Sequence, residues 1–375
     1  MADAASVAFV DLPAQYRDMR DEILGDIGAL IDKSQFVGGP PLARFEEALA
    51  AYCGVRHAVG CSDGTAALVL ALKGAGLRPG DGVVVPTNSF IASANAVVHA
   101  GGAPVLVDCD PETYLLDLAQ AEAALAAGRA RFLLPVHLYG VPCPMEGVLA
   151  LARAHDAAVI EDNAQALGAT LPGGARTGSA GLAAGVSFYP AKNLGAFGQA
   201  GAILTDSDTL ARTARTYAEQ GTGSTRYHHD VIGWNNRLDT LQAAVLARLL
   251  PRLDGFNEGR RRAAAWYAAR LPADRLQRVP AGATPCWHLF EYRCDSPDHR
   301  GRLQAALDEA RIGWGLHYPI PIHRQRAYAH LPTQALPVAE RLAETLLSLP
   351  MHPNLTEEQV DGVCAVVNRV DPRRA

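Results

Sequence analysis

The sequence lacks the features that mark several classes of protein. No run of uncharged apolar residues approaches the roughly 20 residues that span a bilayer, and the N-terminus carries Asp3 without a basic segment, so we expect neither a membrane helix nor a secretory signal. A formal net charge of −5 gives no electrostatic reason to expect nucleic acid or an anionic membrane as a partner. The seven cysteines show no CxxC spacing, which argues against a disulfide or zinc framework and predicts free thiols in the cytoplasm.

The chain does have length and a regular alternation of elements. Its 375 residues, 49% of them hydrophobic, exceed one minimal core and fit a two-domain enzyme. Predicted strands occupy residues 82–86, 104–108, 132–136, 157–162, 186–189 and 201–205, and predicted helices occupy 65–73, 90–100, 118–127 and 145–155. The apolar runs are continuous, which indicates strands buried on both faces. This alternation predicts an α/β fold with a mostly parallel central sheet between helices.

The pattern changes after Asp206. A basic helical stretch follows near residues 257–269, and residues 356–359 have the form of a capping box that opens a final helix. We therefore expect a large domain over residues 1–250, including an N-terminal arm, and a smaller C-terminal α+β domain over residues 251–375.

The strongest chemical signal is a lysine just past a predicted buried strand, in the segment Ser187–Gly195. Flanked by Pro190, Asn193 and Gly195, Lys192 lies on an irregular loop where its amine can point into a cleft. It could condense there with an aldehyde if burial or nearby cations keep part of it unprotonated. The alternative interpretation is a surface lysine near a turn.

A second signal is a carboxylate pair at the end of the strand predicted over residues 157–162. Ligands collect at the carboxyl ends of parallel strands, and strand alternation sends Glu161 and Asp162 to opposite faces, so Asp162 is the candidate. A pyridoxal-phosphate (PLP) enzyme needs one carboxylate against the pyridine nitrogen, so that the ring can withdraw electrons. A helix-capping aspartate or a magnesium ligand would look the same.

Two further segments fit the same cofactor. Small and polar residues at 60–65 lead directly into an apolar helix, which makes a phosphate cradle with a hydroxyl from Thr65, although an ordinary helix cap has the same form. Phe90 follows another strand and could stack on a flat ring, or pack in the core. The order of phosphate turn, aromatic, acidic strand end and lysine is that of fold-type I PLP enzymes.

With these motifs the chain resembles the DegT/StrS-type sugar aminotransferase family over roughly residues 7–367. The matching stretches are Phe36–Pro40, Gly64–Leu68, Pro135–Gly140, Glu161–Gln165, Ser187–Gly195, Gly233–Asp239 and His317–His323.

The resemblance implies a role for each matching residue. Lys192 would be the Schiff-base lysine and proton shuttle, Asp162 would pair with the pyridinium, and Gln165 would contact the 3-oxygen side of the ring. The remaining cofactor contacts would be Gly64, Thr65 and Ser187 at the phosphate, Phe90 on the ring, and Asn235 from the partner subunit of a homodimer with a shared active site.

The resemblance also implies the substrates. The amino donor would be an amino acid, expected to be L-glutamate, and the acceptor a nucleotide-linked 3-keto or 4-keto deoxysugar in amino-sugar biosynthesis, including that of antibiotics. The segment with His317, Tyr318 and His323 would lie near the sugar, or form a rigid turn. No metal is expected, because adjacent His228 and His229 point apart without a third ligand nearby.

Other functions share these residues. A glutamine-dependent cyclitol aminotransferase differs only in substrates. Related PLP-dependent sugar dehydratases carry histidine where this chain has Lys192, which favours transamination here.

Overall fold

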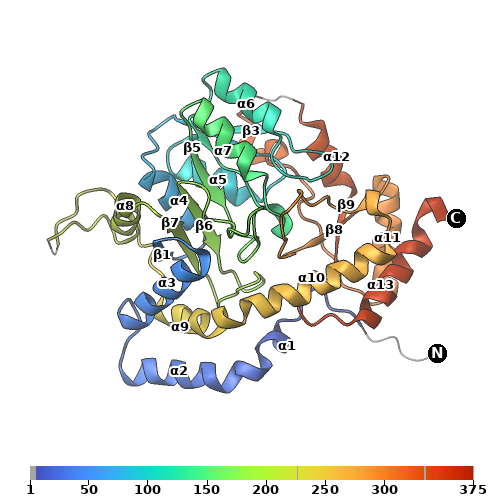
Figure 1. Ribbon diagram of the computed structural model, residues 1–375, viewed down its shortest axis with the longest axis horizontal. Coiled ribbons are helices and arrows are strands. Elements are labelled where there is room, and N and C mark those ends of the chain that lie inside the picture. The colour runs from blue at the N-terminus through green and yellow to red at the C-terminus, as the bar shows by residue number, and fades with distance from the viewer. Residues whose placement is uncertain (1–5, 226, 333–334, 375) are drawn as a thin grey trace.

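Two β-sheets organise the chain (Figure 1), and the computed structural model describes residues 6–225, 227–332 and 335–374. Within these residues, one sheet has seven strands and the other has two. The strands are β1 (His57–Cys61), β2 (Gly82–Pro86), β3 (Ala103–Val107), β4 (Phe132–Leu133), β5 (Ala158–Asp162), β6 (Ala183–Ser187), β7 (Gly201–Thr205), β8 (Phe290–Arg293) and β9 (Leu346–Leu349).

The large sheet has the order β1-β7-β6-β5-β4-β2-β3. All neighbours from β3 to β6 pair in parallel, whereas β7 runs antiparallel to both β6 and β1. Strand β1 therefore points the same way as β6, and among the described strands of this sheet only β7 is reversed. The predicted α/β fold with a mostly parallel sheet is confirmed.

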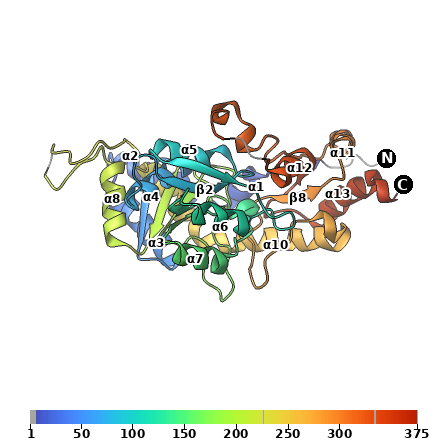
Figure 2. The same cartoon turned by 90° about the horizontal axis from the view of Figure 1, so that it is seen from above.

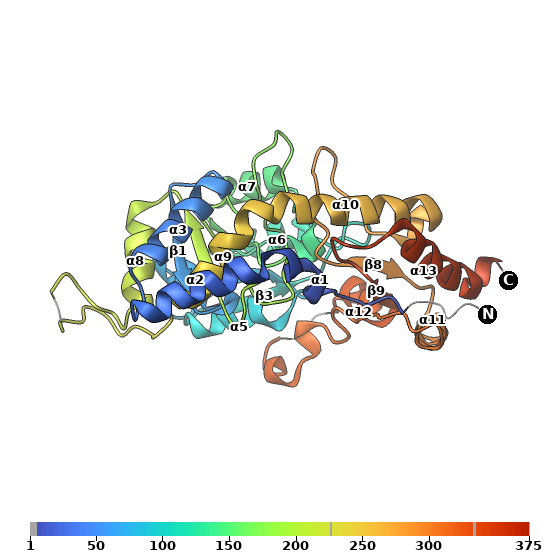
Figure 3. The same ribbon diagram turned by 90° about the horizontal axis from the view of Figure 1, so that it is seen from below.

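Helices cover the large sheet on both sides, with α5 on one face and α6 and α7 on the other (Figures 2 and 3). The described α-helices are α1 (Leu12–Tyr16), α2 (Arg20–Asp32), α3 (Pro40–Cys53), α4 (Gly64–Gly74), α5 (Ile91–His99), α6 (Leu118–Ala126), α7 (Met145–Ala154), α8 (Asp208–Ala218), α9 (Thr240–Leu249), α10 (Leu253–Arg270), α11 (Pro297–Glu309), α12 (Pro337–Thr345) and α13 (Glu357–Val370). None of the helices in the described ranges is long and apolar enough to cross a membrane.

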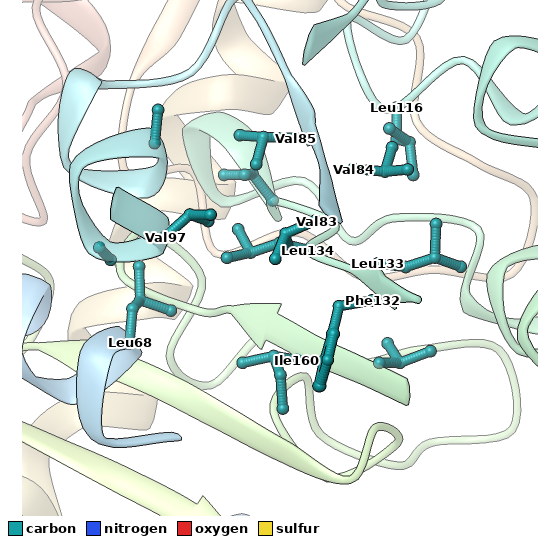
Figure 4. Close-up of a cluster of buried hydrophobic side chains, with 14 of the residues drawn as sticks. Leu68, Val83, Val84, Val85, Val97, Leu116, Phe132, Leu133, Leu134 and Ile160 are labelled. Atoms are coloured by element: carbon teal, nitrogen blue, oxygen red, sulfur yellow. The ribbon is translucent and has the colours of Figure 1, made fainter. Parts of the chain in front are cut away.

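The core explains why the strands are apolar without alternation. Val83, Val84 and Val85 of β2 are all fully buried. Figure 4 shows Val83 on the side of Val97 of α5, and Val84 on the opposite side with Leu116. Helices on both faces leave no strand face for water, so polar residues are absent from the middle of β2.

The strand boundaries differ from the prediction where side chains are small. Strand β1 was not predicted, and β6 begins at Ala183, because its alanines and Gly185 carry no strand signal. A Cβ built on Gly185 would lie 2.6 Å from Leu68 Cδ2, so close packing of α4 on the sheet requires this glycine. Strand β4 ends at Leu133, two residues before Pro135, which has no N–H to extend the ladder.

The C-terminal part packs α10, α11 and α13 around the antiparallel pair β8–β9, and α10 runs from the large sheet to this smaller one (Figure 1). The capping box is confirmed: the Thr356 hydroxyl accepts from the Gln359 N–H, and Gln359 Oε1 accepts from the Thr356 N–H. The predicted boundary at residues 250/251 falls in the 3-10 turn Leu250–Arg252 and stays a prediction.

Candidate active site

A cavity of about 690 Å³ lies at the carboxyl ends of the co-directional strands. Its lining residues come from the ends of β5 and β6, from the start of α4, and from residues 317–318 in the loop between α11 and α12. The residues predicted from the sequence that line it are Gly64, Thr65, Phe90, Asp162, Gln165, Ser187, Lys192, His317 and Tyr318.

Lys192 reaches this cavity from a turn that follows β6. Its backbone N–H donates to the Tyr189 carbonyl at 2.7 Å, which closes the turn five residues after the strand ends at Ser187. Burial lowers the pKa of the amine to about 8, although the nearby Asp162 charge acts against this shift. A fraction of the amine is therefore neutral, and nucleophilic, near neutral pH.

Asp162 ends β5 and presents its carboxylate to the same cavity. Its Oδ2 accepts from the Ser93 hydroxyl at 2.7 Å, and its Oδ1 accepts from the Ala164 N–H at 3.1 Å. Burial raises the pKa of Asp162, and these two donors and Lys192 only partly offset it. Glu161 points to the other side of β5, where its Oε1 accepts from the N–H groups of Ala180 and Gly181.

The first turn of α4 meets the end of β6 very closely. A Cβ on Gly64 would lie 2.6 Å from Ser187 Cβ, so only glycine allows this approach. Asp63 caps the helix by accepting from the Ala66 N–H at 2.9 Å. The N–H groups of the first helical turn, with the Thr65 and Ser187 side chains, give one corner of the cavity a chemistry that suits an anion.

Phe90 and Tyr318 form the aromatic side of the cavity. Phe90 is 50% exposed, which rules out the core role that its sequence position left open. The two rings lie 5.2 Å apart between centroids. Gln165 is held from both sides: its Oε1 accepts from the Tyr139 N–H at 2.7 Å, and its Nε2 donates to the Tyr318 hydroxyl at 3.0 Å.

Two predicted site residues lie elsewhere. The His323 ring hydrogen-bonds Thr87 Oγ1 at 2.8 Å and Glu340 Oε1 at 2.9 Å, so it is used in packing and does not line the cavity. Asn235 accepts from Arg237 at 3.1 Å and does not line the cavity of its own chain. The prediction placed Asn235 in the site of a partner subunit, and it stays a prediction.

His288, in the loop just before β8, was not predicted from the sequence. Its Nε2 is 3.4 Å from Lys192 Nζ, and its Nδ1 is 3.2 Å from Asn193 Oδ1. Asn193 Nδ2 donates to Asn257 and to a backbone carbonyl, so its Oδ1 is left to accept from His288. The Nδ1–H tautomer follows, and the Nε2 lone pair faces the lysine amine. Burial and the charge of Lys192 lower the pKa of His288, which keeps the ring neutral.

These parts fit a flat heteroaromatic aldehyde that carries a phosphate. The two groups that donate hydrogen bonds to the buried Asp162 carboxylate are neutral, so a cationic ring N–H in the cavity would further offset its burial. The α4 corner suits a phosphate, Phe90 suits a ring face, and Lys192 suits the aldehyde carbon. No group of three or more His, Cys, Asp or Glu side chains in the described part of the chain could hold a metal ion.

Comparisons with known proteins agree with this geometry. The model of the DegT/DnrJ/EryC1/StrS aminotransferase family matches residues 17–368. A UDP-N-acetyl-3-dehydro-alpha-D-glucosamine 3-aminotransferase of Acidithiobacillus ferrooxidans is 43% identical over 98% of this chain and 99% of its own. A dTDP-3-amino-3,4,6-trideoxy-alpha-D-glucose transaminase of Streptomyces venezuelae is 41% identical over 99% and 98%. The structure of S. venezuelae DesV, solved with a ketimine intermediate, has a TM-score of 0.93 and 41% identity, covering 98% of this chain and 99% of that one.

Proposed function

Because the chain belongs to the DegT/DnrJ/EryC1/StrS aminotransferase family, we propose that it is PLP-dependent and moves an amino group from L-glutamate to a nucleotide-linked keto-sugar. The observation that carries the proposal is the buried Lys192 amine, with its pKa lowered to about 8, in one cavity with the Asp162 carboxylate. The cytoplasmic location stays a prediction from the sequence.

Seven residues of this chain would hold PLP, and Gln165 would contact the 3-oxygen side of its ring. Asp162 would pair with the ring nitrogen, Phe90 would stack on the ring, Lys192 would bind the aldehyde carbon, and the phosphate would lie at Gly64, Thr65 and Ser187. When bound, PLP supplies a carbonyl that condenses with amines and a ring that withdraws electrons from the bond being broken.

Lys192 is the acid and base of the proposed reaction. Its Nζ would take the proton from the α-carbon of the amino donor and later return a proton to the carbon that carried the aldehyde of PLP. His288 Nε2, 3.4 Å away, accepts a hydrogen bond from this amine and orients its lone pair toward the cavity. Asp162 would keep the ring nitrogen of bound PLP protonated, and that positive charge would stabilise the electrons left behind when the proton is removed.

The sugar is proposed to be a 3-keto hexose. The names of the two relatives described above place the amino group at carbon 3 of the sugar, in one case on a UDP sugar and in the other on a dTDP sugar. The predicted sugar segment places His317 and Tyr318 at the cavity, and these two side chains are proposed to contact the sugar.

A homodimer would complete the site with Asn235 of the second subunit. The segment between α8 and α9 projects from the body of the molecule (Figures 1 and 2), and its Ile232 is 95% exposed. Asn235 lies at the base of this segment, where it bridges Glu219 just after α8. Tyr189, which lines the cavity, and Ile320, two residues after Tyr318, are each about half exposed. Exposed apolar groups of this kind favour burial against a second copy.

Borohydride labelling tests the lysine directly. The sequence contains three lysines, Lys33, Lys73 and Lys192, so peptide mapping of the reduced protein distinguishes them without ambiguity. We expect the B6 ring on Lys192 in the wild type and in the control Lys33→Ala. Lys192→Ala should lose the label and all turnover while keeping its circular dichroism spectrum. A label on another lysine, or turnover by Lys192→Ala, would overturn the proposal.

Substrate trials test the rest of the proposal. The panel contains UDP- and dTDP-linked 3-keto and 4-keto sugars and a keto-cyclitol, each with glutamate or glutamine as donor. Amination of a 3-keto nucleotide sugar with glutamate is expected. Preference for the cyclitol with glutamine would replace this proposal with the cyclitol function.

A further inference from the structure

A line of three polar side chains leads from the core of the small sheet to the cavity. The carboxyl of Glu291, on β8, hydrogen-bonds the Ser348 hydroxyl on the paired strand β9. Ser348 Oγ lies 2.7 Å from Nδ1 of His317, whose ring lines the cavity. We name Glu291, Ser348 and His317 together the His317 relay.

The ring of His317 is fixed in place. Phe9 stacks on it, the Tyr139 hydroxyl donates to its backbone carbonyl, and Gly315 pairs with Ser348 through two backbone hydrogen bonds of 3.1 and 2.9 Å. A Cβ at Gly315 would lie 2.7 Å from His317 Cε1, so the ring position depends on this glycine. Nδ1 is used by Ser348, and Nε2 has no hydrogen bond to any other described side chain.

His317 stays uncharged across the physiological range. Burial and the charge of Lys192 lower the pKa of its ring to about 4. A neutral imidazole carries one N–H, so one ring nitrogen donates and the other accepts. The group on Nδ1 therefore decides what Nε2 offers to the cavity.

Glu291 lies where its own charge is costly. It is 1% exposed, and burial raises the pKa of its carboxyl to about 8. The ionisable side chains that its charge acts on are Tyr114, Tyr139 and Tyr318, all neutral at this pH, and no described cation compensates it. Its Oε2 has no hydrogen-bond partner among the described residues, so a protonated carboxyl satisfies its hydrogen only through Oε1 and Ser348.

The two states of Glu291 impose opposite directions on the relay. A protonated Glu291 donates to Ser348, which then donates to His317 Nδ1, and Nε2 carries the hydrogen. An ionised Glu291 accepts from Ser348, which then accepts from Nδ1–H, and Nε2 is left with a lone pair. We propose that Glu291 is a positioning residue that sets the tautomer of His317 through Ser348, and keeps Nε2 as a hydrogen-bond donor to an oxygen of the substrate.

Labelling with ¹⁵N-histidine reads the tautomer without turnover. The full chain carrying its cofactor is measured about one pH unit below and above the Glu291 pKa of about 8, and the His317 signals are assigned by their loss in His317→Gln. We expect a protonated Nε2 at the lower pH and a protonated Nδ1 at the higher pH. Glu291→Gln and Ser348→Ala should each show one tautomer at both pH values. Glu344→Gln, an exposed glutamate of α12, is the matched control and should behave as the wild type.

The outcomes separate this inference from the proposed function, on which its statement about substrate rests. One His317 tautomer at both pH values in the wild type, or an unchanged switch in both Glu291→Gln and Ser348→Ala, would overturn it even if transamination is found. With the substrate identified, the wild-type KM for the sugar should rise about tenfold across the same pH step, the value of one hydrogen bond, with kcat changed less. In Glu291→Gln this ratio of KM values should be close to one.

Discussion

At the scale of single residues, burial decides which groups carry charge around the cavity. It lowers the pKa of Lys192 and raises those of Asp162 and Glu291. These shifts act in the direction that burial imposes on any ionisable group, since removal from water disfavours the charged form. A lysine that is partly neutral and a carboxylate that gains from a cationic partner are what a PLP site requires.

Asp162→Asn tests the requirement for a carboxylate that pairs with a cationic partner. The amide keeps the shape and a hydrogen bond but loses the charge that would hold the ring nitrogen protonated. We expect cofactor binding to weaken moderately and kcat to fall by about 100-fold or more. Single-turnover kinetics with glutamate measure this loss, and Glu161→Gln is not a suitable control, because Glu161 accepts several buried N–H groups. Ser179→Ala serves instead, because the Ser179 hydroxyl donates to the Arg176 carbonyl and does not line the cavity.

Glu291 also makes stability depend on pH. Its pKa is raised from 4.5 to about 8, so the folded state keeps a proton that the unfolded state releases between these values. The free energy of unfolding should therefore decrease as pH rises through this window, by on the order of 1 kcal/mol per pH unit from this group. Urea denaturation of the wild type and Glu291→Gln measures it. The difference between the two curves should change with pH; a constant difference would contradict the prediction.

At the scale of elements, the ends of helices and strands bring the functional groups together. Strands β5 and β6 end side by side, with Asp162 paired to Gly185, so the loop carrying Lys192 begins next to Asp162. Helix α10 holds the segment that brings His288 to the cavity: Arg260 Nη1 donates to the carbonyls of Trp287 and His288, each at 3.2 Å. This arginine fixes the segment that places His288 against the lysine.

The capping box of α13, a helix that packs on the β8–β9 sheet, contributes to the free energy of unfolding. Thr356→Ala removes the side-chain acceptor of the Gln359 N–H and should lower the free energy of unfolding by about 1 kcal/mol. Thr356→Ser keeps the hydroxyl and should cost much less. Chemical denaturation compares the two variants, and equal losses would show that the methyl group, not the cap, matters.

At the scale of the whole molecule, a shared site predicts complementation between two inactive variants. Lys192→Ala lacks the amine and Asn235→Ala lacks the contact proposed to come from the other subunit. In a mixed dimer one of the two sites contains neither substitution, so mixing the variants after partial denaturation and refolding should restore activity. Each variant refolded by itself is the control. No recovery in a confirmed mixed dimer would place Asn235 outside the partner's site.

The sequence by itself determined the features that local patterns encode. Continuous apolar runs indicated strands buried on both faces, and a polar group directly after such a run marked the sheet edge where Lys192 and Asp162 lie. The capping box was readable because its two hydrogen bonds span three residues. The small-residue strands β1 and β6 were lost or shortened, because alanine and glycine carry little strand preference.

Only the tertiary structure decided the contacts between distant segments. His288 meets Lys192 across 96 residues of sequence, and Ser348 joins Glu291 across 57. The sequence treated His317 and His323 alike, yet one lines the cavity and the other bonds Thr87 and Glu340. The charge and the tautomer of a buried side chain depend on the atoms packed around it. Those atoms come from distant elements of the chain, so short-range sequence patterns do not predict them.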